Sequence, residues 1–294
     1  MTSLRRNPGR LAAWAFLGIV LLVTLFPFYW MIRTALTPAK DLFSDSTSLV
    51  PGTLTWVNFE RILGLTTDAE TVAAGGSLAH LDFLLYLRNS LIYSVTIAVT
   101  QTLFCAAAGY ALARLRFRGR QFVFALVISA LMVPPIFTLL PNFVLVKSLD
   151  WLNTWQGVLA PMLLMTPFAV FFLRQFFLSI PREIEEAAYL DGAGVWRQFT
   201  RLILPMTKGP LLTIGLITAV NSWKEYLWPL LVGKDEDMRL MTAAIGVLQQ
   251  SGPNTSPDWT GLMAASVLTV VPVLLLLLFF GRRLVESISF TGMK

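Results

Sequence analysis

The chain has 294 residues, of which 55% are hydrophobic and 14% are charged, and its formal net charge is +6 at pH 7. This composition lies outside the range of soluble globular proteins. The positive charge would suit a nucleic-acid site, but its distribution along the chain favours a membrane topology instead.

Apolar stretches long enough to cross a bilayer recur along the whole chain. A helix needs about 20 apolar residues to cross a hydrocarbon core roughly 30 Å thick. We predict six membrane-spanning helices, at about residues 11–32, 88–113, 121–146, 155–174, 209–232 and 261–281. No alternating ten-residue pattern indicates strands of a membrane barrel. The predicted fold class is therefore an all-α membrane protein.

The basic residues predict which side of the membrane each connecting segment occupies. With the N-terminus inside, residues 1–10, 114–120, 174–208 and 282–294 lie inside and hold fifteen of the 23 Lys and Arg residues. The outer segments hold seven. This asymmetry follows the positive-inside rule, so both termini are predicted to be cytoplasmic. Arg5, Arg6 and Arg10 could also begin a signal peptide, but the following apolar run is too long and lacks a clean cleavage site.

Two longer segments are predicted to lie outside, at residues 34–85 and 233–259. The first contains a small-residue patch at 73–77, which we interpret as a flexible tip. Turn signals at 251–258 indicate an ordered loop rather than a helix in the second. The only histidine, His80, and the only cysteine, Cys105, are too few for a Cys/His zinc site, and the chain has no phosphate-binding loop.

Prolines fall at membrane depth in three of the predicted helices. They are Pro134, Pro135, Pro141, Pro161, Pro167 and Pro272. Each removes a helical hydrogen bond and favours a kink. The kinks have two interpretations: irregular packing, which the pattern favours, or bent helices around a translocation path. The small-residue run at 106–109 predicts a close contact between helices.

Residues 175–208, here called the docking segment, are the most polar interior part of the chain. Pro181 suits the start of a helix whose first turns carry Glu183, Glu185 and Glu186, because carboxylates stabilise the positive end of a helix. Gly192 is predicted to end this helix in a left-handed cap.

A second short helix is predicted to follow Gly192. It places Trp196, Phe199 and Ile203 on one face, and Pro205 is expected to end it and return the chain to the bilayer. Physical reasoning leaves two interpretations open: an amphipathic hairpin that lies on lipid, or a docking site for another protein.

The spacing of the docking segment resembles the E-A-A loop of binding-protein-dependent ABC importer permeases. Glu186-Ala187-Ala188 is followed by Gly192 and, after nine intervening residues, by Leu202-Ile203-Leu204-Pro205, with Leu202 where Ile is usual. Residues 108–114 and 223–229 are similar to motifs of maltose-type sugar permeases. The resemblance implies a type I permease fold in a bacterial inner membrane. It also implies a cytoplasmic ATPase-docking site formed by Glu185, Glu186, Ala187, Ala188, Asp191, Gly192, Trp196, Phe199, Leu204 and Pro205.

The resemblance also implies a set of partners. They are a second permease subunit, two copies of a cytoplasmic ATPase, an external solute-binding protein and a sugar delivered by it. ATP and Mg²⁺ would bind the ATPases, so the chain itself would hold no cofactor and would not be an enzyme. The tail at 282–294 lies where such permeases reach toward the ATPases, although its composition departs from the usual pattern.

Lys224 and Glu225 are the only charges that we place within a predicted span, and such charges usually face a cavity or a partner. They could line a translocation path together with Trp223, Tyr226 and Trp228, whose rings could stack on sugars. Anchoring at the outer interface and an ordinary aromatic belt are the favoured interpretations.

Two other functions remain open at this stage. An ion-coupled secondary transporter would need coupling groups in the membrane, of which the sequence has few. An importer for a non-sugar solute such as glycerol phosphate would share the same permease architecture.

Overall fold

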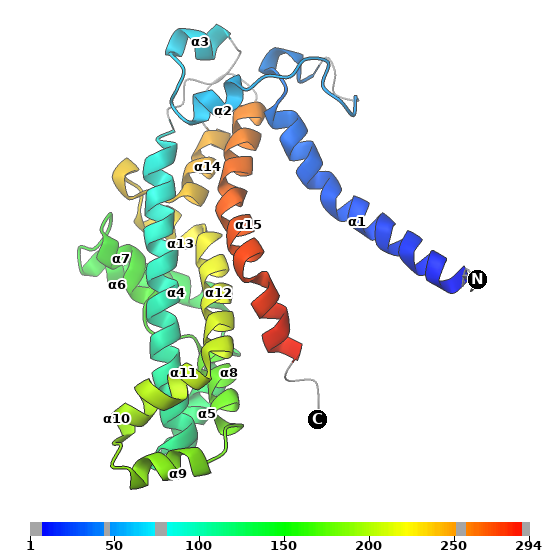
Figure 1. The fold of residues 1–294 in the computed structure, drawn as a ribbon. Coiled ribbons are helices and arrows are strands. Elements are labelled where there is room, and N and C mark those ends of the chain that lie inside the picture. Colours follow the sequence, from blue (N-terminus) through cyan, green and yellow to red (C-terminus); the bar gives the residue numbers. More distant parts are fainter. Residues whose placement is uncertain (1–7, 44–47, 74–80, 251–256, 290–294) are drawn as a thin grey trace, which may run out of the picture. The chain divides into compact units, whose positions relative to one another are not determined.

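Helices account for all regular secondary structure in residues 8–43, 48–73, 81–250 and 257–289, which are the residues that the computed structural model describes (Figure 1). The chain divides into two units. Unit 1 comprises residues 1–83 and 245–271, and unit 2 comprises residues 84–244 and 272–294.

Unit 1 contains the first long helix and the helices of the first predicted outer segment. They are α1 (Pro8–Ala35), α2 (Val57–Ile62) and α3 (Asp68–Ala73). Helix α1 contains the predicted span 11–32 and exposes large apolar side chains along its length, such as Trp14, Phe16 and Leu22. These side chains suit a lipid environment. The predicted flexible tip at 73–77 falls almost entirely outside the described residues.

An ion pair joins α2 to the start of α15 (Trp259–Ser289) within unit 1. The guanidinium of Arg61 donates from Nη1 to Oδ2 of Asp258 at 2.6 Å and from Nη2 to Oδ1 at 3.1 Å. Both side chains are buried, at 7% and 10% exposure. The backbone N–H of Gly261 also donates to Asp258 at 2.9 Å. A Cβ on Gly261 would lie 2.7 Å from Oδ2 of Asp258 and 2.8 Å from Nη2 of Arg61, so a larger residue would displace the ends of these two side chains.

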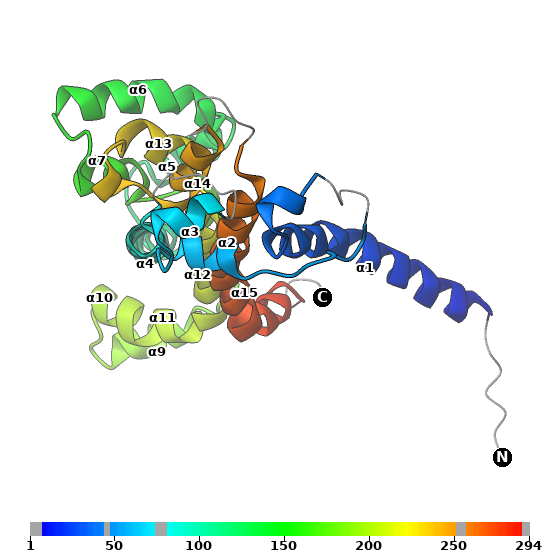
Figure 2. The same ribbon diagram turned by 90° about the horizontal axis from the view of Figure 1, so that it is seen from above.

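Unit 2 contains most of the helices. They are α4 (Phe83–Arg114), α5 (Arg120–Ala130), α6 (Pro135–Ser148), α7 (Trp155–Leu159), α8 (Pro167–Leu178), α9 (Glu183–Leu190), α10 (Val195–Gln198), α11 (Leu204–Met206), α12 (Lys208–Trp223), α13 (Leu227–Val232) and the start of α14 (Met241–Gln250). Seen from above, α4 lies between α6 and α9 (Figure 2).

Close packing of small residues holds α4 against α8. A Cβ on Gly109 would lie 3.1 Å from the backbone nitrogen of Arg174 and 3.3 Å from the carbonyl oxygen of Val170. The predicted close helix contact at 106–109 is therefore confirmed. Below it, Tyr110, Leu173 and Phe177 belong to a buried apolar cluster of this unit.

Several of the predicted spans are broken, two of them at prolines where the sequence predicts kinks. The predicted span 121–146 consists of α5 and α6, which meet at an angle of 100° across Pro134. The predicted span 155–174 is also broken, with a bend of 46° before Pro167. Prolines explain both breaks, because each lacks the N–H that would continue the helix. By length and composition, the described residues offer three candidate spans, or up to six if each bent pair counts as one.

Two further differences concern the predicted fifth span and the outer segment after it. The span 209–232 divides into α12 and α13, with residues 224–226 between them. The segment 233–259, expected to be a loop, contains helix α14. The turn signals that suggested a loop lie mostly at 251–256, outside the described residues, whereas α14 precedes them.

Candidate functional site

The first part of the docking segment is helix α9, which begins at Glu183, two residues after the predicted start at Pro181. Its first turn carries three carboxylates, which stabilise the positive end of the helix. Gly192 ends it with a φ of +80°, in the left-handed region that favours glycine. The N–H of Gly192 donates to the carbonyl of Tyr189, and that of Ala193 donates to Ala188. The predicted glycine cap is confirmed.

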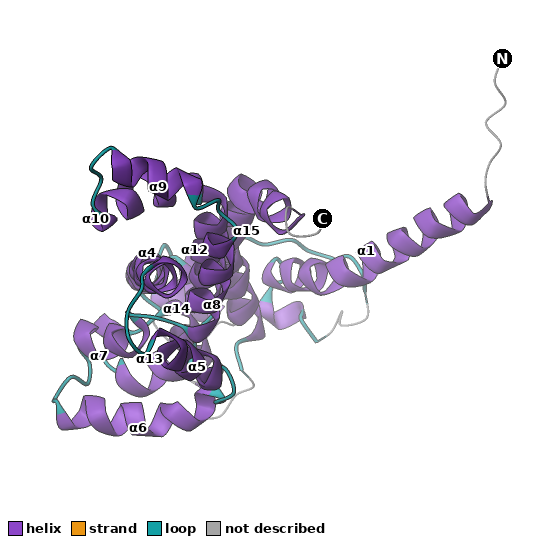
Figure 3. Ribbon diagram, turned by 90° about the horizontal axis from the view of Figure 1, so that it is seen from below, coloured by secondary structure: helices purple, strands orange, loops and turns teal. Residues whose placement is uncertain are grey.

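The second part of the docking segment runs through α10, a π-helical turn at Phe199–Ile203 and α11. It then bends by 80° into α12. The bend lies at Thr207, so the prediction that Pro205 ends the helix is wrong by two residues. Pro205 falls within the first two residues of α11, where a missing N–H costs little, and Thr207 leaves helical geometry. Seen from below, α9 and α10 lie side by side (Figure 3).

Three large apolar side chains of the docking segment are more than 70% exposed. Tyr189, Leu190 and Trp196 are 73%, 86% and 72% exposed. Sequence reasoning found Trp196 but missed Tyr189 and Leu190. Their position in the last turn of α9, just before the predicted glycine cap, could have indicated that they are exposed.

Trp196 lies next to Phe199, as the predicted shared face requires, with their ring centroids 5.8 Å apart, but Phe199 is not exposed. It is 6% exposed, and its ring packs 5.0 Å from that of Tyr110. Phe199 therefore supports the docking segment from within and is not available to a partner.

The other predicted docking residues divide by exposure. Those that are exposed are Glu186, Ala187, Asp191, Gly192 and Pro205, and those that are partly buried are Glu185, Ala188 and Leu204. The exposed residues lie on α9, its glycine cap and α11.

Arg114, the last residue of α4, anchors the docking segment. Its Nε lies 3.1 Å from Oε2 of Glu185, and both side chains are buried. One terminal nitrogen of Arg114 also donates to the backbone carbonyls of Phe177 and Ile180 at the end of α8. Sequence reasoning explained Arg114 by topology alone and missed this role. Glu185 is therefore an internal contact of the chain rather than a docking surface.

A second feature of unit 2 is a cavity of about 420 Å³ lined by residues of α4, α8 and α12. Its polar side chains include Gln101, Asn221 and Glu225, and Glu225 is the one charged residue among the described residues that line it. The side-chain amide of Gln101 donates to the backbone carbonyl of Met162 at 2.8 Å, at the point where the helix is interrupted before α8.

The aromatic candidates for a translocation path do not line this cavity. Trp228 is 1% exposed, and its indole N–H donates to the carbonyl of Val158 at 3.0 Å. Trp223 is also buried, at 9% exposure, and Tyr226 is half-buried in the break after α12. Trp228 therefore belongs to a packed core, which corrects both its sugar-stacking and its aromatic-belt interpretations. In the described part of the chain, no group of three or more His, Cys, Asp or Glu residues is arranged to hold a metal ion.

Comparison with known proteins gives consistent matches. Residues 105–290 match the family model described as binding-protein-dependent transport system inner membrane component. Over 99% of its length the chain is 31% identical to the arabinooligosaccharides transport system permease protein AraQ of Halalkalibacterium halodurans, of which it covers 100%. It is 33% identical to the sn-glycerol-3-phosphate transport system permease protein UgpE of Yersinia pestis, over 92% of this chain and 93% of that protein.

A solved structure also resembles the fold. It is the crystal structure of a bacterial ABC transporter involved in the import of the acidic polysaccharide alginate. The TM-score is 0.79 at 20% identity, and the match covers 96% of this chain and 98% of that chain.

Proposed function

Since the chain belongs to the family of binding-protein-dependent transport system inner membrane components, we propose that it translocates a sugar or oligosaccharide. It is a multi-pass inner membrane subunit of a bacterial ABC importer and is not itself catalytic. Membership implies an external binding protein, an ATPase and a partner permease. The proposed assembly has one second permease subunit and two ATPase copies.

The proposed topology has six spans and two cytoplasmic termini. The excess of Lys and Arg in residues 1–10, 114–120, 174–208 and 282–294 supports it. Each broken pair, α5 with α6 and α7 with α8, then serves as one span, and α12 with α13 forms the fifth. In this arrangement the docking segment lies in the cytoplasm, where ATP is available.

The exposed apolar side chains of the docking segment carry the ATPase-docking proposal. Tyr189, Leu190 and Trp196 stand on a segment that is otherwise rich in charge, and such apolar groups mark protein interaction sites. Glu186 and Gly192 keep the roles that the E-A-A motif implies, as a charged contact and as the turn of the docking segment. Arg114 connects this surface to α4, so a displacement of α9 by the ATPase would reach the membrane helices.

The charge of the cavity favours a neutral sugar over an anionic solute. The carboxylate of Glu225 would repel a phosphate group, and no Lys or Arg is among the described residues that line the cavity. Hydroxyl groups of a sugar would instead pair with Gln101, Asn221 and the carboxylate. This supports a substrate of the arabinooligosaccharide class over glycerol phosphate.

The experiment co-expresses the chain with its partner subunits and measures ATPase co-purification and ATP-driven uptake in vesicles. Replacing Tyr189, Leu190 and Trp196 together by Ser should abolish both, because each buried apolar anchor contributes about 2 kcal/mol or more to an interface. Parallel uptake assays with labelled arabinooligosaccharide and labelled glycerol phosphate should show transport of the sugar.

The matched control replaces Leu54, Trp56 and Leu65, which are equally exposed in the first outer segment, by Ser. It should leave ATPase co-purification unchanged. Normal ATPase binding and uptake by the docking variant would overturn the docking assignment. Uptake of glycerol phosphate alone would overturn the sugar assignment and leave docking intact.

A further inference from the structure

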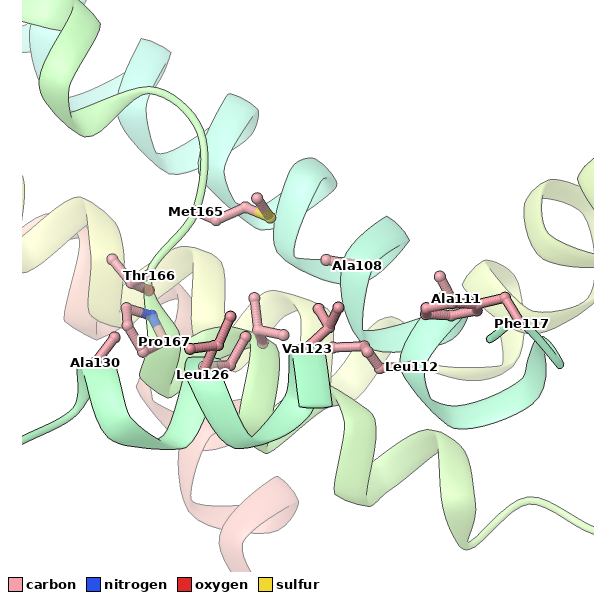
Figure 4. A pocket seen from close by; sticks show the side chains of 12 residues that line it. Ala108, Ala111, Leu112, Phe117, Val123, Leu126, Ala130, Met165, Thr166 and Pro167 are labelled. Atoms are coloured by element: carbon pink, nitrogen blue, oxygen red, sulfur yellow. The ribbon is translucent and has the colours of Figure 1, made fainter. Parts of the chain in front are cut away.

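An apolar groove of about 430 Å³ runs between α4, α5 and α8 of unit 2. Phe117 lies at one end of this groove, and Met165, Thr166 and Pro167 lie at the other (Figure 4). The groove shares only Thr166 with the cavity that contains Glu225, and all the other described residues that line the two differ.

Small side chains create the groove. Ala108 and Ala111 of α4 and Ala130 of α5 line the groove, and their small side chains leave a space that the chain does not fill. Its α5 wall includes Val123 and Leu126, which are 41% and 53% exposed. The groove is therefore an open, apolar surface on helices of a membrane protein, and an acyl chain is a suitable occupant.

A basic pocket adjoins the groove, and Phe117 lines both. The pocket contains Arg116, Arg118 and Arg182, all three exposed. Among the described residues, no ion pair engages these three arginines. Their neighbours are already engaged, because Arg114 pairs with Glu185 and Arg120 donates to the carbonyl of Leu115 at 3.2 Å.

We propose that the groove and the basic pocket together bind one anionic phospholipid. The phosphate lies among Arg116, Arg118 and Arg182, whose guanidinium groups suit bidentate contacts to phosphate oxygens, and an acyl chain lies in the groove. A free anion would account for the arginines but not for the groove. A neutral lipid would account for the groove but not for the arginines.

The bound lipid would also reach the docking segment. Arg182 directly precedes α9, whereas Arg116 and Arg118 belong to the connection between α4 and α5. A phosphate held by all three would join these two connections beside the Arg114–Glu185 pair. This inference concerns the lipid surroundings of the permease and does not depend on which solute it transports.

Native mass spectrometry of the full chain tests the proposal, with phosphatidylglycerol as the probe. Phosphatidylcholine with the same acyl chains and the deacylated headgroup glycerophosphoglycerol serve as comparison ligands. Phosphatidylglycerol should remain bound, and the other two should bind far more weakly. Replacing Arg116, Arg118 and Arg182 by Gln should weaken phosphatidylglycerol binding about a hundredfold, from roughly fivefold for each arginine.

The matched control replaces Arg197, Arg201 and Lys208 by Gln, which removes the same charge from exposed positions of the docking segment. It should change binding less than twofold. A second variant, Ala111→Phe, fills the groove and should weaken binding while leaving all the arginines in place.

Three outcomes would overturn the proposal. Equal losses in both triple variants would show non-specific attraction between charges. Equal binding of glycerophosphoglycerol would show a simple anion site. Absence of phosphatidylglycerol from the wild-type chain would assign the arginines to an acidic protein partner.

Discussion

Two buried ion pairs of similar chemistry are held in different ways. The Arg61–Asp258 pair is bidentate, and its carboxylate also accepts the N–H of Gly261 and the hydroxyl of Thr260. In the Arg114–Glu185 pair, Nε of Arg114 lies 3.1 Å from one carboxylate oxygen, while the hydrogen bonds of Arg114 go to the backbone carbonyls of Phe177 and Ile180.

The two ion pairs therefore differ in how easily their partners can separate. Asp258 directly precedes α15 and accepts hydrogen bonds on both carboxylate oxygens. Glu185 can leave Arg114 without breaking the bonds between Arg114 and α8. The first pair therefore stabilises the fold of unit 1, and the second is suited to attach a segment that moves during transport.

Asp258→Ala should have the largest effect, because it leaves Arg61 buried without its carboxylate. Removing one partner of a buried ion pair costs about 3–5 kcal/mol. The measurement is thermal unfolding of the purified chain, compared with Asp235→Ala, which removes an exposed carboxylate. A loss no larger than that of the control would contradict the comparison.

Glu185→Gln should destabilise the chain less, by about 1–2 kcal/mol, because Arg114 keeps its carbonyl acceptors. It should also uncouple ATP hydrolysis from uptake and make the docking segment more sensitive to protease. Glu183→Gln, on the exposed side of the same helical turn, is the control. If Glu185→Gln proved as damaging as Asp258→Ala, the two pairs would not differ in role.

Gly192→Ala should have the smallest effect, a loss of about 1 kcal/mol, because alanine is strained at a φ of +80°. No atom stands within 4 Å of the position of a new Cβ, so the loss would report backbone strain alone. Gly194→Ala is the control, since its φ is −67° and its surroundings are equally open. Equal stability of the two variants would rule out a strained cap.

Local sequence signals predicted the parts of the docking segment that depend on local chemistry. Pro181 marked the start of α9 to within two residues, and Gly192 marked its end, because charge and backbone freedom act within one helical turn. The burial of Phe199 and the contact between Arg114 and Glu185 were not predictable in this way. Both depend on residues far apart in the chain.

In the membrane helices, too, local sequence signals predicted some features, whereas others depend on residues far apart in the chain. Hydropathy located the apolar stretches, and the prolines indicated where they would be interrupted. The size of the bend at Pro134 and the existence of α14 did not follow, since the first depends on neighbouring helices and the second carries no strong start signal. Trp228 resembled an interfacial aromatic residue until its packing against Val158 was known.

The bend between α5 and α6 has a consequence for mapping the chain in its membrane. The 11 residues of α5 rise about 16 Å, roughly half the thickness of a hydrocarbon core. If α5 stands upright in the bilayer, the chain turns sideways before it reaches the far surface. A reporter domain fused at residues 131–134 would therefore emerge in neither aqueous compartment, even though the apolar stretch containing it is long enough for a full crossing.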